Sequence, residues 1–321
     1  MKSVVATRYG GPEALAIVDR DEPVVRPGDV RIRVRAASLN PIDFKIRQGK
    51  LRLAMRLEPP IALGCDVAGV VDAVGEQVSS FAVGDEVYAR LEKDRMGGLS
   101  ELVAADQAVV ARKPARATFE EAAAVPLAGL TAGQRVLVHA GAGGVGSLAI
   151  QIGKALGLWV ATTTSTKNVE LVTGLGADLV IDYTRESPRD RLSELDAVFD
   201  TLGGQSELEA LTLVRRGGTV VGIGGLPDAA FARARLPWWA RPLISVATLR
   251  RRRAAARAGA RFLYLFMRPD GAELAELAAW IDDGRLRPLI HRAYPLADVG
   301  EAFAELERGR ARGKIVVTIP A

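Results

Sequence analysis

The sequence predicts an α/β protein in which a small β-rich domain is joined to a doubly wound parallel sheet. The chain has 321 residues, which exceeds the size at which a single hydrophobic core usually stops growing, so two domains are expected. From Arg135 onward, strand-like and helix-like segments alternate, as they do in parallel sheets covered by helices. The first third shows only short β-like runs. These two patterns indicate two domains of different architecture.

The β-rich domain is predicted from three segments of the first third. Residues 30–36 alternate apolar side chains with arginine, a pattern typical of a strand with one buried and one solvated face. Residues 67–74 and 83–87 are further β-like runs bounded by glycines. We expect these segments to form antiparallel sheet.

A glycine-rich turn opens the second domain. An apolar strand from Arg135 leads into Gly-x-Gly-x-x-Gly, followed by an amphipathic helix at 147–156. In a dinucleotide-binding turn the first glycine permits a tight reversal, the second lets the backbone approach a pyrophosphate, and the third lets the helix lie close to the strand. The alternative is an ordinary strand-to-helix turn. The residues predicted to bind cofactor here are Gly141, Gly143, Gly144, Val145 and Gly146.

The rest of the second domain follows the same alternation. Glycine and apolar spacing place a helix that ends before Gly176, one near 206–214 and one at 272–281. The expected strands are 159–163, 179–182, 195–200, 219–223 and 260–266. After Arg285 a helix at 298–306 and a strand at 314–319 fit poorly as another strand-helix unit, so the tail is expected to return to the first domain.

Composition limits the chemistry. One cysteine, Cys65, excludes an internal disulfide, and with only His139 and His291 as imidazoles it leaves too few soft ligands for a structural zinc site. We interpret Cys65 and His139 as buried core residues. The sequence shows neither a signal peptide nor an apolar run long enough to span a bilayer, so a cytoplasmic protein with no membrane partner is expected.

Eight segments follow one another in a distinctive order along the chain. They are 9–13 (YGGPE), 39–45 (LNPIDFK), 64–69 (GCDVAG), 83–88 (VGDEVY), 97–101 (GGLSE), 126–131 (PLAGLT), the glycine turn and 313–316 (GKIV). Together they resemble the zinc-independent quinone oxidoreductase branch of the medium-chain dehydrogenase/reductase superfamily. Where zinc-dependent relatives carry Gly-His-Glu, this chain has Cys65-Asp66, and their four-cysteine lobe is absent. The resemblance implies a GroES-like catalytic domain at 1–115 and 286–321 and a Rossmann domain at 116–285.

The end of the second strand of this domain favours NADPH. NAD-binding sheets usually place an acid about 20 residues after the glycine turn, whereas this chain has Thr-Thr-Ser-Thr-Lys at 163–167. Hydroxyls and an ammonium suit a 2′-phosphate, with Ser165 and Lys167 as the predicted contacts. The alternative is a helix N-cap followed by a solvated lysine. The resemblance implies Tyr183 as an adenosine-side contact and Asn40 and Thr131 as nicotinamide-side neighbours; Gly224 is the remaining predicted cofactor contact.

Hydride transfer needs few acid–base groups, because the cofactor carries the reaction. Reduction of a quinone or an α,β-unsaturated carbonyl places negative charge on oxygen, which a nearby donor should stabilise. Lys45, Tyr88 and the Asn40 amide are the candidates, with Asp43 and Asp66 orienting them. Lys45 could instead be a surface lysine, and Tyr88 a packed strand aromatic.

The resulting hypothesis is an NADPH-dependent, zinc-independent reductase of quinones or activated alkenes that binds its substrate between the two domains. The alternatives are an enoyl-thioester reductase of polyketide type and a non-catalytic NADPH-sensing or nucleic-acid-binding relative. The arginine run 250–253 lacks interleaved aromatics, so a solvated or subunit-contacting face is expected rather than a nucleic-acid site. The strand at 260–266 could pair across a two-fold axis in a homodimer.

One departure from the relatives concerns residues 131–135. Relatives continue after Thr131-Ala132 through a helix and a turn, whereas here Gly133-Gln134 leads directly into Arg135. A mean helix has about 11 residues, so this is more than loop trimming. The sequence leaves open whether neighbouring segments have adapted, activity is impaired, or an internal stretch has been lost from the sequence.

Overall fold

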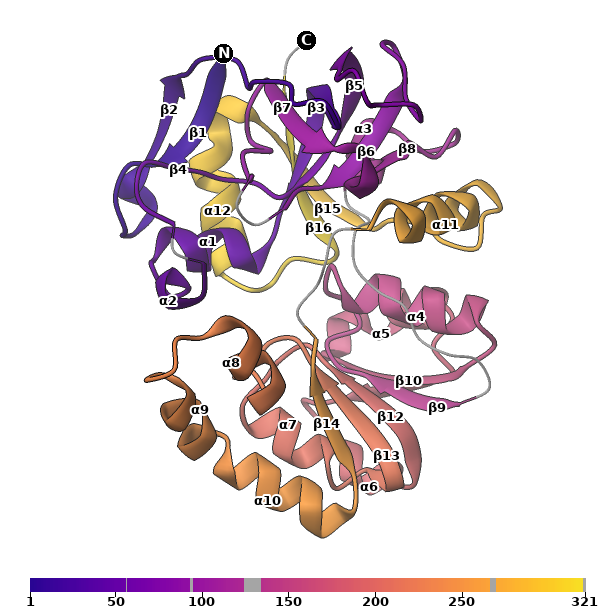
Figure 1. The fold of residues 1–321 in the computed structure, drawn as a ribbon. Helices are drawn as coiled ribbons and strands as arrows, with labels where there is room; N and C mark the ends of the chain where they lie inside the picture. Colours follow the sequence, from indigo (N-terminus) through magenta and orange to yellow (C-terminus); the bar gives the residue numbers. More distant parts are fainter. Residues whose placement is uncertain (56, 93–94, 124–133, 266–269, 320–321) are drawn as a thin grey trace. The chain divides into compact units, whose positions relative to one another are not determined.

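The computed structural model describes residues 1–55, 57–92, 95–123, 134–265 and 270–319. Contacts divide the chain into two units (Figure 1). Unit 1 contains Met1–Pro126 and Arg268–Ala321, and unit 2 contains Leu127–Met267. Each unit has its own sheet and its own hydrophobic core.

Unit 1 is built on two sheets. The smaller has the order β2-β1-β4, and the larger has the order β15-β16-β3-β5-β6-β8, with β7 paired to β3. The long strand β3 shows why the alternation in its sequence matters: Val30, Ile32 and Val34 are buried, whereas Arg31 and Arg33 both reach Asp72. The strands are β1 (Lys2–Ala6), β2 (Leu15–Asp19), β3 (Asp29–Leu39), β4 (Ile61–Ala62), β5 (Asp66–Val74), β6 (Glu86–Arg90), β7 (Leu102–Asp106), β8 (Val110–Arg112), β15 (Ile290–Pro295) and β16 (Lys314–Thr318).

Helices from distant parts of the chain complete unit 1. The tail returns as the sequence suggested, because β16 pairs antiparallel with β3. Helix α3 packs on β3 and β5, and α11 packs on β8. The described residues 116–123 and 270–285, which the sequence placed with the Rossmann domain, lie in unit 1. The helices are α1 (Pro41–Arg47), α2 (Arg52–Met55), α3 (Phe119–Ala123), α11 (Gly271–Asp282) and α12 (Val299–Glu307).

Unit 2 is a parallel sheet with the order β11-β10-β9-β12-β13-β14. Its chain order reverses between β9 and β12, which is the switch point where doubly wound sheets bind nucleotides. The strands are β9 (Arg135–Val138), β10 (Trp159–Thr164), β11 (Leu179–Asp182), β12 (Leu195–Asp200), β13 (Val214–Gly222) and β14 (Arg261–Tyr264). The expected strand at 260–266 is therefore the edge strand β14.

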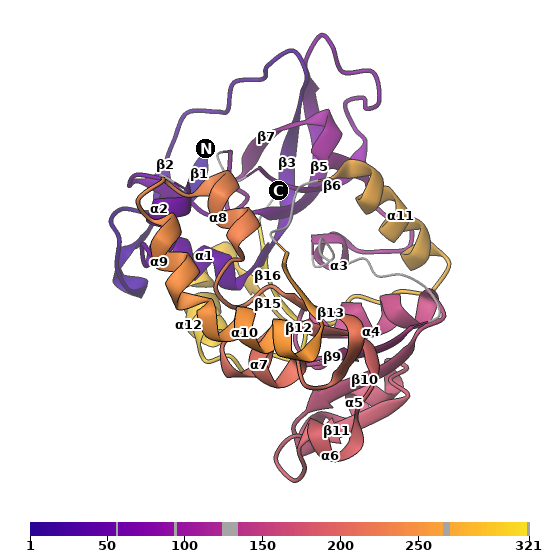
Figure 2. The same ribbon diagram turned by 60° about the horizontal axis from the view of Figure 1, so that its bottom comes forward.

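Helices cover both faces of this sheet (Figure 2). Val136 and Val138 of β9 pack with residues of α4 and α5, whereas Leu137 between them packs with residues of α7 and α10. A strand buried on both sides explains the continuous apolar run in the sequence. The helices are α4 (Gly146–Ala155), α5 (Val169–Gly174), α6 (Pro188–Arg191), α7 (Gln205–Ala210), α8 (Ala229–Arg235), α9 (Arg241–Ala247) and α10 (Leu249–Ala258). Within the described ranges, no helix is long and apolar enough to cross a bilayer.

Candidate functional site

The glycine turn lies at the carboxyl end of β9, at the switch point of the unit 2 sheet. A Cβ atom on Gly141 would lie 2.1 Å from Oγ1 of Thr162, and one on Gly146 would lie 2.2 Å from the carbonyl oxygen of Ala140. Gly146 therefore allows the close approach of helix and strand that the sequence predicted. A Cβ atom on Gly143 would lie 3.2 Å from its nearest neighbour, the carbonyl oxygen of Ala140. The turn is therefore less crowded at Gly143 than at Gly141 or Gly146.

The tight reversal does not fall on Gly141. The residue with positive φ in this turn is Ala140, at 54°, and Gly141 is required by the close packing against β10 instead. The sequence assigned the reversal to the glycine because glycine is the usual residue there. The steric need for Gly141 remains, with a different cause.

Hydrogen-bond donors are available at this turn. Within the described chain, no backbone carbonyl accepts from the N–H groups of Gly144 or Val145. The Oγ of Ser147, in the first turn of α4, is buried and has no partner among the described residues. Free amides and a hydroxyl at a helix N-terminus suit a phosphate group.

His139 directly precedes Ala140 of this turn and is buried. Its Nδ1 lies 3.1 Å from Oγ1 of Thr163, its Nε2 lies 4.0 Å from Asp200, and burial lowers its pKa. Asp200 accepts hydrogen bonds from the N–H groups of Leu202 and Gly203. His139 is a buried, hydrogen-bonded histidine, as the sequence suggested.

The end of β10 carries the residues expected at the 2′ position of the ribose. Ser165 is half-buried, and Lys167 is exposed. Tyr183 is 62% exposed directly after β11, and its N–H donates to the carbonyl of Thr164, so it lies beside this segment. Residues expected from two separate motifs are thus brought together.

Asp182 is a neighbour of this segment that the sequence analysis did not include. It pairs in register with Thr164, accepts from the hydroxyls of Thr166 and Thr184, and lies 3.6 Å from Arg185. These hydroxyl donors lower its pKa. Its place as the last residue of a strand next to the nucleotide-binding strand was the available signal.

Gly224 follows β13 in a loop with little room for side chains. A Cβ atom on Gly224 would lie 2.6 Å from the carbonyl oxygen of Thr201, and one on Gly203 would lie 2.6 Å from the backbone nitrogen of Gly225. The loops after β12 and β13 therefore pack backbone to backbone. Together with the glycine turn, they form an edge of the sheet lined by main chain, which fits a dinucleotide.

A second polar cluster lies in unit 1 and is centred on Asp66, the first residue of β5. Its Oδ1 accepts from Arg90 at 2.6 Å, and its Oδ2 accepts from the Asn40 amide at 2.7 Å and from Ser38 at 3.1 Å. Asp66 is 1% exposed. A buried carboxylate is costly unless it is paired in this way, and both oxygens of Asp66 are hydrogen-bonded.

Lys314 supplies a second cation to this cluster. Its Nζ donates to Oδ1 of Asn40 and lies 3.8 Å from Oδ2 of Asp66. Burial lowers its pKa, and Asp66 acts in the opposite direction. The Asn40 amide is therefore held at both ends, by Lys314 on its oxygen and by Asp66 on its nitrogen. Its remaining hydrogen-bonding capacity is small.

Asp43 lies next to the same cluster. It accepts from the backbone N–H of Asn40 at 2.7 Å, and Oδ1 lies 3.6 Å from the Cys65 sulfur. Burial raises the pKa of Asp43 to about 6 and raises that of Cys65 well above its ordinary value. Cys65 is a buried thiol, in agreement with the sequence analysis.

The three catalytic candidates lie in different environments. Asn40 is half-buried in the cluster described above. Lys45 is half-buried on α1, and its ammonium has no hydrogen-bond or ion-pair partner in the part of the chain that the structure describes. Tyr88 is fully buried, and its hydroxyl donates to the carbonyl of Leu274 on α11. Burial raises its pKa. These contacts favour the packing role that the sequence left open for Tyr88.

Thr131 and the junction between Ala132 and Gly133 lie outside the described residues. Sequence reasoning also missed Arg90 and Lys314 as members of the unit 1 cluster. The signal for Lys314 was a single charged residue in the strand 314–319, whose other residues are apolar except for Thr318. Arg90 is the last residue of β6, which also begins with a charged residue, Glu86, so its charge gave no comparable signal.

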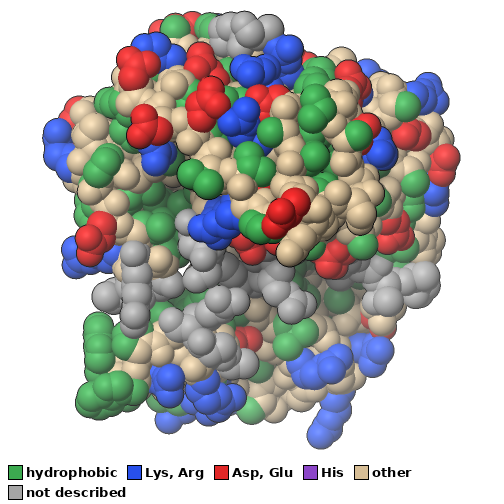
Figure 3. Space-filling view, turned by 45° about the horizontal axis from the view of Figure 1, so that its top comes forward, with side chains coloured by type: hydrophobic (Ala, Val, Ile, Leu, Met, Phe, Trp, Pro, Cys, Tyr) green, Lys and Arg blue, Asp and Glu red, His purple; other side chains and the backbone are tan. Residues whose placement is uncertain are grey.

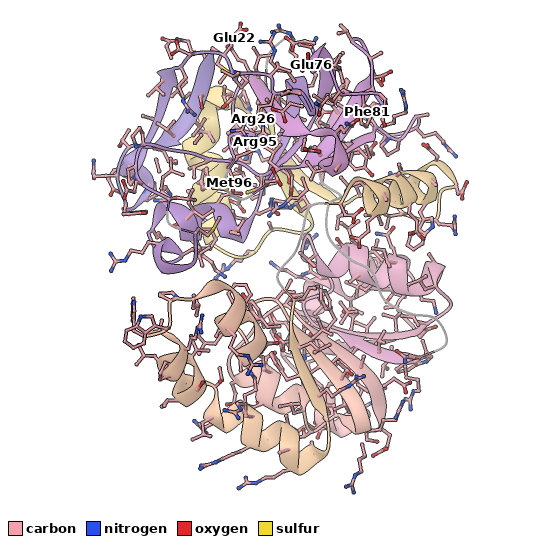
Figure 4. The ribbon with its side chains drawn as sticks, in the orientation of Figure 1. Glu22, Arg26, Glu76, Phe81, Arg95 and Met96 are labelled. Carbon is pink, nitrogen blue, oxygen red and sulfur yellow. The ribbon has the colours of Figure 1, made fainter. Side chains whose placement is uncertain are left out.

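Unit 1 also has a surface hollow of about 540 Å³. Glu22, Arg26, Arg95 and Met96 are among its lining residues (Figure 4). Arg95 donates to Asp29 at 2.8 Å, and the Met96 sulfur lies 3.4 Å from that of Cys65. Two charged residues of this hollow therefore have partners within the protein: Arg95 pairs with Asp29, and Glu22 pairs with Arg31.

Two family models match the chain. The model of the alcohol dehydrogenase GroES-like domain matches residues 26–149, and a model described as zinc-binding dehydrogenase matches residues 175–317. Between them they cover parts of both units. The fold and these two matches thus define a dehydrogenase of GroES-like plus Rossmann architecture.

Individual relatives narrow this class. The chain is 36% identical to the NADPH-dependent alkenal/one oxidoreductase of Arabidopsis thaliana chloroplasts and 36% identical to the 2-methylene-furan-3-one reductase of Solanum lycopersicum, in each case over 99% of this chain and 79% of the relative. It superposes on the quinone oxidoreductase of Coxiella burnetii with a TM-score of 0.86 and 30% identity, covering 100% of this chain and 99% of that one. The chain belongs to the medium-chain dehydrogenase/reductase superfamily, in its quinone oxidoreductase and alkenal reductase branch. It is an NAD(P)H-dependent oxidoreductase of that type.

Proposed function

We propose that the protein reduces quinones or α,β-unsaturated carbonyl compounds with NADPH and without zinc. The observation that carries the cofactor choice is the end of β10, where Ser165 and Lys167 stand in the place of an acidic residue. The substrate class is supported by the relatives named above, two of which are an alkenal/one oxidoreductase and a quinone oxidoreductase.

The neighbouring Asp182 is compatible with a 2′-phosphate. Its two oxygens accept from Thr166 and Thr184, so the carboxylate is turned toward its own loop. Lys167 and Arg185 place two cations nearby. A carboxylate that bound a ribose hydroxyl would instead have to offer an oxygen to the ligand.

The unit 1 cluster supports chemistry without zinc. Asp66 is already neutralised by Arg90 and is near Lys314, and a divalent cation beside these two cations would be repelled. Among the described residues, no group of three or more His, Cys, Asp or Glu side chains is arranged to hold a metal. The ammonium of Lys314 thus provides the positive charge beside Asn40 and Asp66.

The bound cofactor would supply the hydride, and the chain's own residues would position it and stabilise charge on the substrate oxygen. Gly144, Val145 and Ser147 would donate to the pyrophosphate, and Ser165, Lys167 and Tyr183 would contact the adenosine side. Thr131 and Gly224 remain proposed cofactor contacts. Lys45 is the proposed donor to the substrate oxygen, because its ammonium is not committed elsewhere among the described residues. Asn40 would act by orientation, since both ends of its amide are already bound.

Calorimetric titration with NADPH and, separately, NADH tests the cofactor. We expect NADPH to bind at least about tenfold more tightly, or about 1.4 kcal/mol. Lys167→Glu should abolish that preference, whereas Lys50→Glu, which changes an exposed lysine of unit 1, should preserve it. Equal affinity for both nucleotides would contradict the 2′-phosphate assignment. Failure to bind either nucleotide would remove the reductase proposal itself.

Turnover with a benzoquinone, an enone and an enoyl thioester tests the substrate class. We expect NADPH oxidation with the first two, and Lys45→Met should lower kcat about a hundredfold, whereas Lys50→Met should not. Exclusive reduction of the thioester would establish the enoyl-reductase alternative. Tight NADPH binding without turnover on any of the three would establish the non-catalytic alternative.

We also propose a homodimer formed through β14. This strand is the last in the sheet order, and its Leu263 is 49% exposed. Unpaired edge strands readily pair with a second copy. Light scattering should give twice the mass of 34.2 kDa, and Leu263→Lys should yield monomer. A monomeric wild-type protein would contradict this assignment.

A further inference from the structure

The charge of this chain is strongly segregated. Residues 229–265 of unit 2 contain nine arginines and no acidic residue or lysine. Because the whole chain has a formal charge of +5, the remainder is net negative. All of the positive excess is therefore concentrated in the segment that forms α8, α9, α10 and β14.

The same segment exposes large apolar side chains. Trp238 is 78% exposed, Leu243 63% and Val246 73%, and Trp239 is also exposed. Leu243 and Val246 are three residues apart on α9 and so lie on one face of this helix, whereas Trp238 and Trp239 lie in the turn directly before it. Figure 3 shows hydrophobic side chains at the left edge of the lower part of the molecule, with Lys and Arg side chains beside them. Large apolar side chains exposed together mark an interaction surface.

The arginine run 250–253 divides into two parts. Arg251 is buried, donates to Glu207 at 2.7 Å and to the carbonyl of Leu226, and lies 3.8 Å from the ring centre of Phe262. It anchors α10 to the sheet. Arg250, Arg252 and Arg253 are exposed, and within the described chain none of these three forms an ion pair. Three exposed cations thus lie on α10, which begins two residues after the end of α9.

The geometry points to an anionic phospholipid bilayer as the occupant of this surface. We define the membrane-binding surface as Trp238, Trp239, Leu243, Val246, Arg250, Arg252 and Arg253. A bilayer uses both of its components, because tryptophan and aliphatic side chains enter the interface while arginines contact anionic headgroups. A nucleic acid would leave Leu243 and Val246 in water. A symmetric contact with a second copy would bring unneutralised arginines together.

This inference differs from the expectation of no membrane partner, which rested on the lack of a spanning segment. Peripheral binding needs no such segment, only an amphipathic surface and matching charge. It is also independent of the proposed function, because it involves neither the glycine turn nor the Asp66 cluster. The two can fail separately.

Vesicle co-flotation of the full-length protein tests the proposal. We expect binding to vesicles of phosphatidylcholine with 30% phosphatidylglycerol that is at least about tenfold stronger than binding to pure phosphatidylcholine and that falls with added salt. Replacing Arg250, Arg252 and Arg253 by Gln should weaken binding about a hundredfold. Replacing Trp238, Leu243 and Val246 by Ser should weaken it at least about tenfold and remove any blue shift of tryptophan emission on vesicle addition.

Matched controls lie elsewhere on the surface. Val24→Ser with Val83→Ser removes two exposed aliphatic side chains of unit 1, and Arg20, Arg189 and Arg310 replaced by Gln remove the same charge as the basic triple variant. Both controls should bind as the wild type does. Absent or salt-independent binding to the anionic vesicles, or equal losses in the control and surface variants, would overturn the proposal. Tighter binding to duplex DNA that ignores the apolar triple variant would assign the surface to nucleic acid.

Discussion

The two candidate sites of this chain use different parts of the polypeptide. In unit 2 the nucleotide-binding edge is made by main chain, and its key residues are glycines whose Cβ atoms would collide with Thr162 or Ala140. In unit 1 the cluster is made by side chains, and its charges balance one another around Asp66. The first site depends on glycines that lack a Cβ atom, and the second depends on the charged side chains paired with Asp66. They should therefore fail in different ways when mutated.

The largest effect is expected in the charge cluster. Lys314→Met would remove the donor that holds the Asn40 oxygen and would leave Asp66 with Arg90 as its remaining cation, so unfolding free energy should fall by about 3 kcal/mol. Lys2→Met, which breaks the exposed pair with Asp19, should have little effect. Urea denaturation measures both. Equal losses in the two variants would show that burial does not strengthen the Lys314 contacts.

In the main-chain site, Gly146→Ala should lower stability by roughly 2–3 kcal/mol and weaken NADPH binding about a hundredfold. The added methyl group would lie 2.2 Å from a backbone oxygen, so the helix must move away from the strand. Gly174→Ala on α5 meets nothing within 4 Å and should be neutral or slightly stabilising. Calorimetry and thermal unfolding together check this. Unchanged NADPH affinity in Gly146→Ala would show that the glycine turn does not bind the cofactor.

The cluster should also show a pH signature that the glycine turn lacks. The pKa of Asp43 is raised from 3.8 to about 6, so the folded state favours its protonated form. Stability is therefore lost as this carboxyl ionises between about pH 4 and pH 7. Relative to wild type, Asp43→Asn should gain roughly 2 kcal/mol over that range.

The control for this pH dependence is Asp19→Asn. Lys2 lowers the pKa of Asp19, so the stability it contributes is present above its ordinary pKa and is lost as pH falls. The difference between Asp19→Asn and wild type should therefore run in the opposite direction and be small. Denaturation midpoints at several pH values measure both differences. A pH-independent difference for Asp43→Asn would contradict the raised pKa.

The smallest effect separates packing from catalysis. Tyr88→Phe removes one buried hydrogen bond to Leu274 and should lower stability by about 1 kcal/mol while leaving kcat unchanged. Steady-state kinetics beside thermal unfolding test this. A large loss of kcat with unchanged stability would restore the catalytic role for Tyr88.

The two sites also differ in how far the sequence predicted them. The glycine turn is local, so its spacing within 141–146 predicted the turn between β9 and α4, whereas its role in cofactor binding stays a prediction. The cluster joins residues from β3, β5, β6 and β16, and of its members Asn40, Asp43 and Asp66 were predicted. Arg90 and Lys314 carry no local mark of their partners, because pairing across a sheet depends on register. The division of the arginine run, with Arg251 buried between exposed neighbours, also required the structure.

The position of Lys314 has a consequence for protein synthesis. Strand β16 pairs with β3, which a ribosome makes about 280 residues earlier, whereas unit 2 is one continuous stretch of chain. The nascent Rossmann sheet can close before β16 is made, but β3 keeps an open edge and Asp66 lacks one of its cations until β16 emerges. A prematurely terminated chain would carry a finished nucleotide-binding sheet beside an incomplete partner, and quality control could recognise it by that exposed edge.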